Sequence, residues 1–307
     1  MIYAVMKRAL ALFLALVSFF VNLRTAPSRD DTPADAVSVV YADTAFGDVK
    51  LFLPETIDAQ KPTDVIFMIH GGAWVSGGAR IFYGDCREAV KAGYIAASMN
   101  YDKIFNGANA ADMVREVGLA IAAVKAELES RGVAAGKLIM AGHSAGAHIM
   151  LLYAYTQYET CPMDIAFLVS CCAPADFVSD AKAHNSAVGF AAYALLSALT
   201  GEVITPWTLA RNADAIRAVA PVYQITSDVP PTIVVQGTKD RLINYQNSVD
   251  LYNALQENGV DSVHITYEGA GHFLTSKGDA ATRQKFAQYD ALRSEAFYAF
   301  AGKYGTK

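Results

Sequence analysis

Five consecutive residues have the types and the spacing of a serine nucleophile. Gly142-His143-Ser144-Ala145-Gly146 follows an apolar run over 138–141 and precedes an apolar stretch at helical spacing over 147–155. A sharp turn between a strand and a helix brings neighbouring backbone into contact, so side chains at the two glycines would clash while the serine hydroxyl is pushed outward. The pattern predicts a nucleophile elbow with Ser144 as the nucleophile. The alternative is a glycine-rich helix start with a capping serine.

A serine hydroxyl is a weak nucleophile until a neutral imidazole takes its proton, and a carboxylate must orient that imidazole. Two later loops supply these groups in the order Ser, acid, His. Asp240 follows the apolar run 232–236 through Gly-Thr-Lys, and His272 follows the run 262–267 through Glu-Gly-Ala-Gly. Because both runs predict strands of one sheet, we expect both residues at the edge that presents Ser144.

Other residues compete for the roles of acid and base. Asp240 is preferred because it alone occupies the loop directly after the penultimate predicted strand, and His272 because a Gly-Ala-Gly loop presents it. A capping or core histidine is the alternative for His272. The rivals are Asp176, Asp228, Asp250 and Asp261 among the acids and His184 and His264 among the histidines.

The loop after the third predicted strand is a candidate for binding the oxyanion. The tetrahedral intermediate of acyl transfer needs preorganised N–H donors, and the glycines of His-Gly-Gly-Ala-Trp at 70–74 let the backbone approach a substrate closely. We assign the donors to Gly72, Ala73 and the amide of Ala145, with Gly71 shaping the turn. A Gly-Gly turn without function is the alternative.

The elements that must position these residues follow two patterns. Val37–Tyr41 and Val49–Leu53 are separated by Gly47-Asp48 and predict an antiparallel hairpin. From residue 64 short apolar runs alternate with longer helical periods, which predicts a parallel sheet covered by helices on both faces. The further strands are expected at 65–69, 94–100, 137–141, 165–170, 232–236 and 262–267, and the helices at 84–92, 110–130, 145–155, 245–258 and 280–302.

Two segments lie outside this rhythm. Residues 176–228 are much longer than a usual crossover and contain an apolar portion, which predicts an inserted cap over the site, or an apolar face packed on the core, or both.

At the start, Lys7 and Arg8 precede an apolar stretch from Ala9 to Val21 and a polar segment, the layout of a signal sequence. We expect residues 1–26 to be a signal peptide or a membrane anchor of an exported protein, with cleavage left open. The alternative is an apolar helix of the fold.

Composition limits the function classes. The 307 residues, 53% of them hydrophobic, suffice for one large α/β domain, expected at 37–304. A net charge of −5 without a basic cluster argues against nucleic-acid binding. The four cysteines are expected as buried thiols, with one bridge involving Cys161 left open, and no group of residues has metal-ligand spacing.

At these motifs the chain resembles the carboxylesterase and lipase-like branch of the α/β-hydrolase superfamily, which includes hormone-sensitive-lipase-like esterases, feruloyl and acetyl-xylan esterase relatives, and arylformamidases. The resemblance runs from about residue 37 to the C-terminus. Besides the two glycine motifs it rests on Pro-Pro at 230–231, Gly-Thr-Lys-Asp at 237–240 and Gly-His-Phe at 271–273. The loop at 70–74 departs from the pattern, with Gly-Gly-Ala where many esterases have Gly-Gly-Gly.

The resemblance implies the α/β-hydrolase fold and hydrolysis of a small-molecule ester without a cofactor, through an acyl-enzyme on Ser144. Two alternatives stay open. One is an arylformamidase or a peptidase of the same fold, and the other is a non-catalytic binding protein that keeps the fold. The residues give no signal for the oligomeric state.

Overall fold

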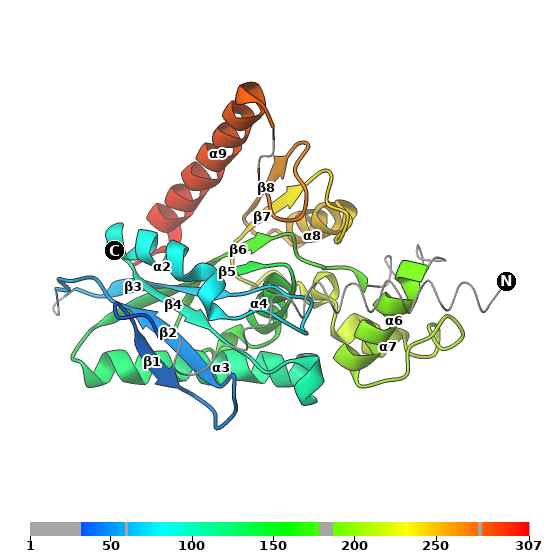
Figure 1. Ribbon diagram of the computed structural model, residues 1–307, viewed down its shortest axis with the longest axis horizontal. Coiled ribbons are helices and arrows are strands. Elements are labelled where there is room, and N and C mark those ends of the chain that lie inside the picture. The colour runs from blue at the N-terminus through cyan, green and yellow to red at the C-terminus, as the bar shows by residue number, and fades with distance from the viewer. Residues whose placement is uncertain (1–31, 59–60, 178–186, 276–277, 307) are drawn as a thin grey trace.

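The computed structural model describes residues 32–58, 61–177, 187–275 and 278–306, in which eight strands form one sheet in the order β1-β2-β4-β3-β5-β6-β7-β8 (Figure 1). β1 and β2 pair antiparallel, β2 pairs antiparallel with β4, and every later pairing is parallel. The strands are β1 Val37–Val40, β2 Asp48–Phe52, β3 Thr63–Ile69, β4 Ile95–Met99, β5 Ala135–His143, β6 Ile165–Cys171, β7 Thr232–Gly237 and β8 Ser262–Tyr267. This confirms the predicted hairpin and parallel sheet.

The continuous apolar runs are strands buried on both faces. In β3, Val65 and Phe67 belong to one core cluster, whereas Ile66 and Met68 belong to the cluster on the other face. Successive side chains of a strand point to opposite faces, so a run of this kind needs helices on both sides.

Helices supply those two layers. α3 Ala110–Ser130, α4 Ala145–Thr156 and α8 Gln246–Glu257 pack on the first cluster, and α2 Tyr83–Lys91 and α9 Ala280–Tyr304 pack on the second (Figure 1). Short 3-10 helices lie at Ala79–Phe82, Ile104–Asn106, Tyr158–Thr160 and Pro221–Gln224. The predicted helices therefore form, with ends displaced by one or two residues.

β5 is longer than predicted. It was expected over 137–141 but continues to His143, because β6 stays paired with it up to the partners His143 and Cys171. The strand therefore delivers its last residue directly to the turn that holds Ser144.

The long segment between β6 and β7 contains helices α6 Ala187–Thr200 and α7 Ala213–Ala218, which lie together in Figure 1. Leu196, Leu199 and Ile216 join the first core cluster. The expected packing on the core is thus present, and the expected cap over the site stays a prediction, with residues 178–186 outside the described part.

The predicted signal peptide or anchor at 1–26 also lies outside the described residues. Among the residues that the structure describes, none of the helices has the length and the apolar character of a membrane span. All four cysteines are described, and each is a free thiol.

Candidate active site

Ser144 lies between β5 and α4 in a strained backbone conformation. Its φ of 55° and ψ of −124° fall where residues other than glycine are rare, and such strain persists only where the surroundings hold it. A Cβ on Gly142 would lie 2.6 Å from Ala147 Cα, and one on Gly146 would lie 2.1 Å from the carbonyl oxygen of Ile69. Both glycines are therefore required for the close packing of the turn, as predicted.

Asp240 and His272 come together from the loops after β7 and β8. Their Oδ2 and Nδ1 atoms are 2.7 Å apart, and both side chains are buried. A carboxylate only accepts, so Nδ1 carries the proton and Nε2 keeps a free lone pair. The ring thus presents the nitrogen that a general base needs.

The surroundings keep Asp240 ionised. Its Oδ2 also accepts from Gln236 Nε2 at 2.9 Å, and its Oδ1 accepts from the backbone N–H groups of Leu242 and Ile243 at 2.8 and 3.0 Å. Burial alone would raise the pKa of Asp240, but the hydrogen bond and charge of His272 and the two backbone donors outweigh it and lower that pKa below its ordinary value.

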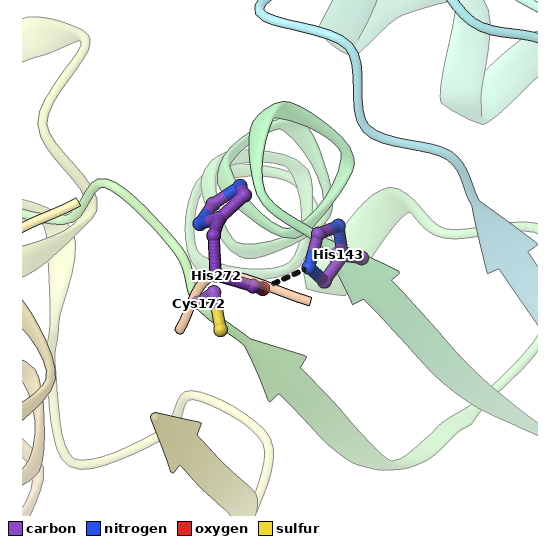
Figure 2. Close-up of side chains that lie close together, drawn as sticks. All are labelled: His143, Cys172 and His272. Carbon is purple, nitrogen blue, oxygen red and sulfur yellow. Dashed lines mark hydrogen bonds between the residues drawn. The ribbon is translucent and has the colours of Figure 1, made fainter. Parts of the chain in front are cut away.

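The loop that carries His272 is tied to the residue before the nucleophile. His143 Nε2 donates to the backbone carbonyl of His272 at 2.8 Å, and the two rings lie 4.8 Å apart (Figure 2). Burial lowers the pKa of His143 to about 4, so this ring is a neutral hydrogen-bond donor. Sequence reasoning placed His143 in the elbow but missed this contact, because nothing along the chain relates residues 143 and 272.

Ser144 and His272 are both described, and they share no hydrogen bond in this structure. Ser144 is largely buried, with 9% of its surface exposed. Hydrogen bonds between nucleophile and base are often long before substrate binds and shorten in the complex. The role of Ser144 as nucleophile therefore stays a prediction. The loops that carry Ser144, Asp240 and His272 are placed so that this role is chemically possible.

The loop at 70–74 packs directly against the elbow. A Cβ on Gly71 would lie 2.8 Å from the carbonyl oxygen of His143 and 3.0 Å from Ser144 Cβ. The backbone then passes through three positive φ angles, 129° at Gly72, 52° at Ala73 and 59° at Trp74. Glycine suits the first of these, and the other two are strained.

The predicted oxyanion donors lie in the loop after β3 and at the start of α4. The N–H groups of Gly72, Ala73 and Ala145 donate to no acceptor among the described residues. Ala145 is fully buried and begins α4, where first-turn N–H groups lack helical partners and attract anions. These donors are available to an oxygen that develops negative charge beside Ser144.

A second anchor joins this loop to the core. Trp74 Nε1 donates to His148 Nδ1 at 3.1 Å, and His148 Nε2 donates to the carbonyl of Val219 at 2.7 Å. Both ring nitrogens of His148 are therefore engaged away from Ser144.

The rival residues have other partners or lie apart. Asp228 accepts from Ser227, Asp250 from Gln246, and Asp261 pairs with Lys303. None of the four rival acids bonds to His272 within the described residues, and Asp240 does. His264 pairs with Ser248, and His184 lies outside the described residues.

His143, Cys172 and His272 are near enough to consider a metal, since one candidate ligand atom from each lies within 4.8 Å of the others (Figure 2). Hydrogen bonding explains the cluster better. His272 Nδ1 donates a hydrogen bond to Asp240, and His143 Nε2 donates one to the His272 carbonyl. Burial raises the pKa of the Cys172 thiol, which keeps it protonated and a poor ligand.

The chain is similar to curated esterases over most of its length. The chain is 24% identical over 223 residues to esterase LipC of Mycobacterium tuberculosis, covering 69% of this chain and 53% of the relative. It is 26% identical over 255 residues to isoprenylcysteine alpha-carbonyl methylesterase ICME of Arabidopsis thaliana, covering 76% and 56%. The chain thus spans about half the length of these curated relatives.

A solved structure, esterase B from Lactobacillus rhamnosis, superposes with a TM-score of 0.67 at 17% identity, covering 96% of this chain and 99% of that one. Such a likeness shows the fold, which is that of an α/β hydrolase. Residues 49–255, more than half of the 307, match the BD-FAE family. The chain belongs to the BD-FAE family.

Proposed function

We propose that the protein is a serine hydrolase that cleaves carboxylic esters through an acyl-enzyme on Ser144. The observation that carries the proposal is the hydrogen bond between Asp240 Oδ2 and His272 Nδ1, on a loop bound to the elbow by His143. The relatives named above are esterases, which favours an ester over the amide of an arylformamidase or a peptidase.

The reaction follows from the positions of these groups. Ser144 Oγ attacks the carbonyl carbon while His272 Nε2 takes its proton, and the ionised Asp240 stabilises the resulting imidazolium. The N–H groups of Gly72, Ala73 and Ala145 bind the oxyanion. The carbon–oxygen bond to the alcohol then breaks, and His272 returns the proton to the alcohol. Water, activated by His272, attacks the acyl-enzyme and releases the acid.

The first prediction tests the nucleophile. Purified protein should hydrolyse p-nitrophenyl acetate, and a fluorophosphonate probe should label it covalently. Ser144→Ala should lose the labelling and lower kcat by about 10⁵- to 10⁶-fold, because the attacking oxygen is gone. The matched control is Ser130→Ala, at the exposed end of α3, which should keep both.

Two outcomes would contradict the proposal. Equal labelling of wild type and Ser144→Ala would remove Ser144 from the mechanism. Hydrolysis of N-formylkynurenine or an aminoacyl anilide without any ester hydrolysis would assign the same residues to amides, and inactivity on all of these would favour a binding protein.

We also propose that residues 1–26 export the protein or anchor it to a membrane, and that 37–304 form its catalytic domain. Support comes from the basic, apolar and polar order of the first residues, together with the BD-FAE match inside the second range. Fractionation of cells that express the full chain would test it, and a wholly cytosolic product would refute it.

A further inference from the structure

His70 lies fully buried at the start of the loop that carries the predicted oxyanion donors. Its Nδ1 lies 2.6 Å from the carbonyl oxygen of Gly71, which can only accept, so Nδ1 carries the proton. Nε2 then has a lone pair, and Lys103 Nζ donates to it at 3.0 Å. The tautomer of His70 is therefore determined from both sides of the ring.

This tautomer bears on the predicted donor at Gly72. The Gly71 carbonyl and the Gly72 N–H belong to one planar trans peptide and point in opposite directions. When His70 holds the carbonyl, the N–H is directed away from His70. The contact is tightly enclosed, because a Cβ on Gly77 would lie 2.3 Å from the Gly71 oxygen and 2.6 Å from His70 Nδ1.

Lys103 is a buried lysine, which is energetically unfavourable because its amino group is removed from water. The residue is 3% exposed and forms no salt bridge within the described part of the chain. Nζ donates to the carbonyl of Tyr101 at 2.6 Å and lies 3.5 Å from the centre of the Tyr101 ring. Burial disfavours the ammonium form and lowers the pKa of Lys103, although the negative charges of Glu116 and Asp102 oppose this shift. An apolar side chain of similar size would fill the space without that cost. Compared with an apolar side chain, the lysine adds two hydrogen bonds, one to the Tyr101 carbonyl and one to His70, and the second reaches the loop at 70–74.

The loop also needs external support. Ala73 and Trp74 are consecutive non-glycine residues with positive φ, a strained conformation that persists only where the surroundings hold it. The segment around Lys103 supplies two further bonds, from Tyr101 OH to the His70 carbonyl and from the Ile104 N–H to the Trp74 carbonyl, both 3.0 Å long. The segment after β4 thus forms hydrogen bonds with both the first and the last residue of the loop, His70 and Trp74.

We propose that Lys103 is a positioning residue of the oxyanion hole. It holds His70 in the Nδ1–H tautomer, and His70 holds the Gly71 carbonyl so that the Gly72 N–H stays aligned for the oxyanion. The ammonium and the neutral amine can both donate this bond. The inference rests on the proposed ester hydrolysis, because it is the developing oxyanion that uses the Gly72 N–H.

The test is Lys103→Met, which keeps the length of the side chain and removes the donor. On p-nitrophenyl acetate we expect kcat to fall about 10- to 100-fold, somewhat less than for loss of a whole donor. KM should stay within about 3-fold, since the ground-state carbonyl makes weaker use of the hole. Affinity for a trifluoromethyl ketone, which forms an oxyanion on Ser144, should fall by a similar factor to kcat.

The matched control is Lys137→Met. Lys137 Nζ also donates to a backbone carbonyl, that of Tyr304 at 2.9 Å, but it lies at the end of β5 remote from Ser144. This variant should keep kcat and inhibitor affinity. Unchanged kcat in a folded Lys103→Met protein, or equal losses in both variants, would overturn the proposal.

A double-mutant cycle shows whether Lys103 acts through His70. Adding Lys103→Met to His70→Ala should change kcat by less than about 2-fold, because without the His70 imidazole Lys103 can no longer act on the Gly71 carbonyl. Losses that multiply would contradict the proposal.

A measurement on wild type covers the case in which the variants do not fold. Long-range ¹H–¹⁵N spectra should show His70 protonated on Nδ1, and protonation on Nε2 alone would refute the relay. The proposed function fails separately, if wild type hydrolyses no ester, whereas an active enzyme with the Nε2–H tautomer refutes the role of Lys103 alone.

Discussion

At the scale of single residues, Asp240 has a fully assigned set of donors. His272 and Gln236 donate to one carboxylate oxygen, and two backbone N–H groups donate to the other. An amide has only one accepting oxygen, so asparagine would place an NH₂ group against existing donors in either orientation. If that group faced His272 Nδ1, the ring would have to move its proton to Nε2, where it would block the acceptance of the Ser144 proton.

We therefore predict that Asp240→Asn lowers kcat by about 10⁴-fold. The Asp250→Asn variant is the control, because Asp250 accepts from exposed Gln246 on α8. Within the described residues it forms no hydrogen bond to Ser144, Asp240 or His272. Steady-state kinetics with p-nitrophenyl acetate measure both variants, with circular dichroism to verify folding. Retention of a tenth of wild-type activity in Asp240→Asn would exclude this carboxylate as the acid.

At the scale of elements, the sequence predicts those helices, strands and loop positions that depend on the local pattern of residues. The central strands were predictable because they are apolar runs buried on both faces. The positions of Ser144, Asp240 and His272 were predictable because each lies in the turn or loop that follows a predicted strand. The contacts of Lys103 with His70 and of His143 with the His272 carbonyl were not predictable. They depend on which side chains the strand order brings together, and Lys103 lies in a segment without a motif.

The close contact between α4 and β3 belongs to this scale and gives a stability prediction. A Cβ on Gly146 would lie 2.1 and 2.5 Å from the carbonyl oxygens of Ile69 and His70, so Gly146→Ala must push the helix off the strand. We expect it to lower the free energy of unfolding by about 2 to 4 kcal/mol.

The control for this prediction is Gly302→Ala in α9, where a Cβ would meet nothing within 4 Å. Alanine favours a helix over glycine, so this variant should gain about 0.5 to 1 kcal/mol. Urea denaturation followed by circular dichroism compares the two. Similar stability of both variants would show that the α4–β3 contact relaxes without cost.

At the scale of the whole molecule, Glu116 joins three parts of the fold. It lies on α3, is 5% exposed, and accepts from the Asp102 N–H after β4 at 2.8 Å and from Tyr41 OH after β1 at 3.3 Å. Burial raises the pKa of Glu116 to about 7, and the negative charge of Asp102 adds to this, whereas the hydrogen bonds and Lys103 oppose it. The carboxyl is thus neutral in the folded protein at pH values where it ionises in the unfolded chain.

This difference fixes the sign of a pH effect. A folded pKa above the unfolded value of 4.5 contributes stability that is complete below pH 4.5 and is lost as pH rises through about 7. Glu116→Gln can still accept both hydrogen bonds and cannot ionise. Relative to wild type it should therefore gain stability as pH rises from 4.5 to 7, by at most about 3 kcal/mol.

Urea denaturation of both proteins at several pH values measures this gain, and the difference between them cancels the other titrating groups. Glu129→Gln, at an exposed position of the same helix, is the control for loss of a carboxylate from the surface. A difference between Glu116→Gln and wild type that stays flat, or falls, from pH 4.5 to 7 would mean that the buried carboxyl ionises as readily in the folded protein as in the unfolded chain. The junction of α3 with the strands would then have to accommodate a charge, and a neutral, hydrogen-bonded Glu116 would be excluded.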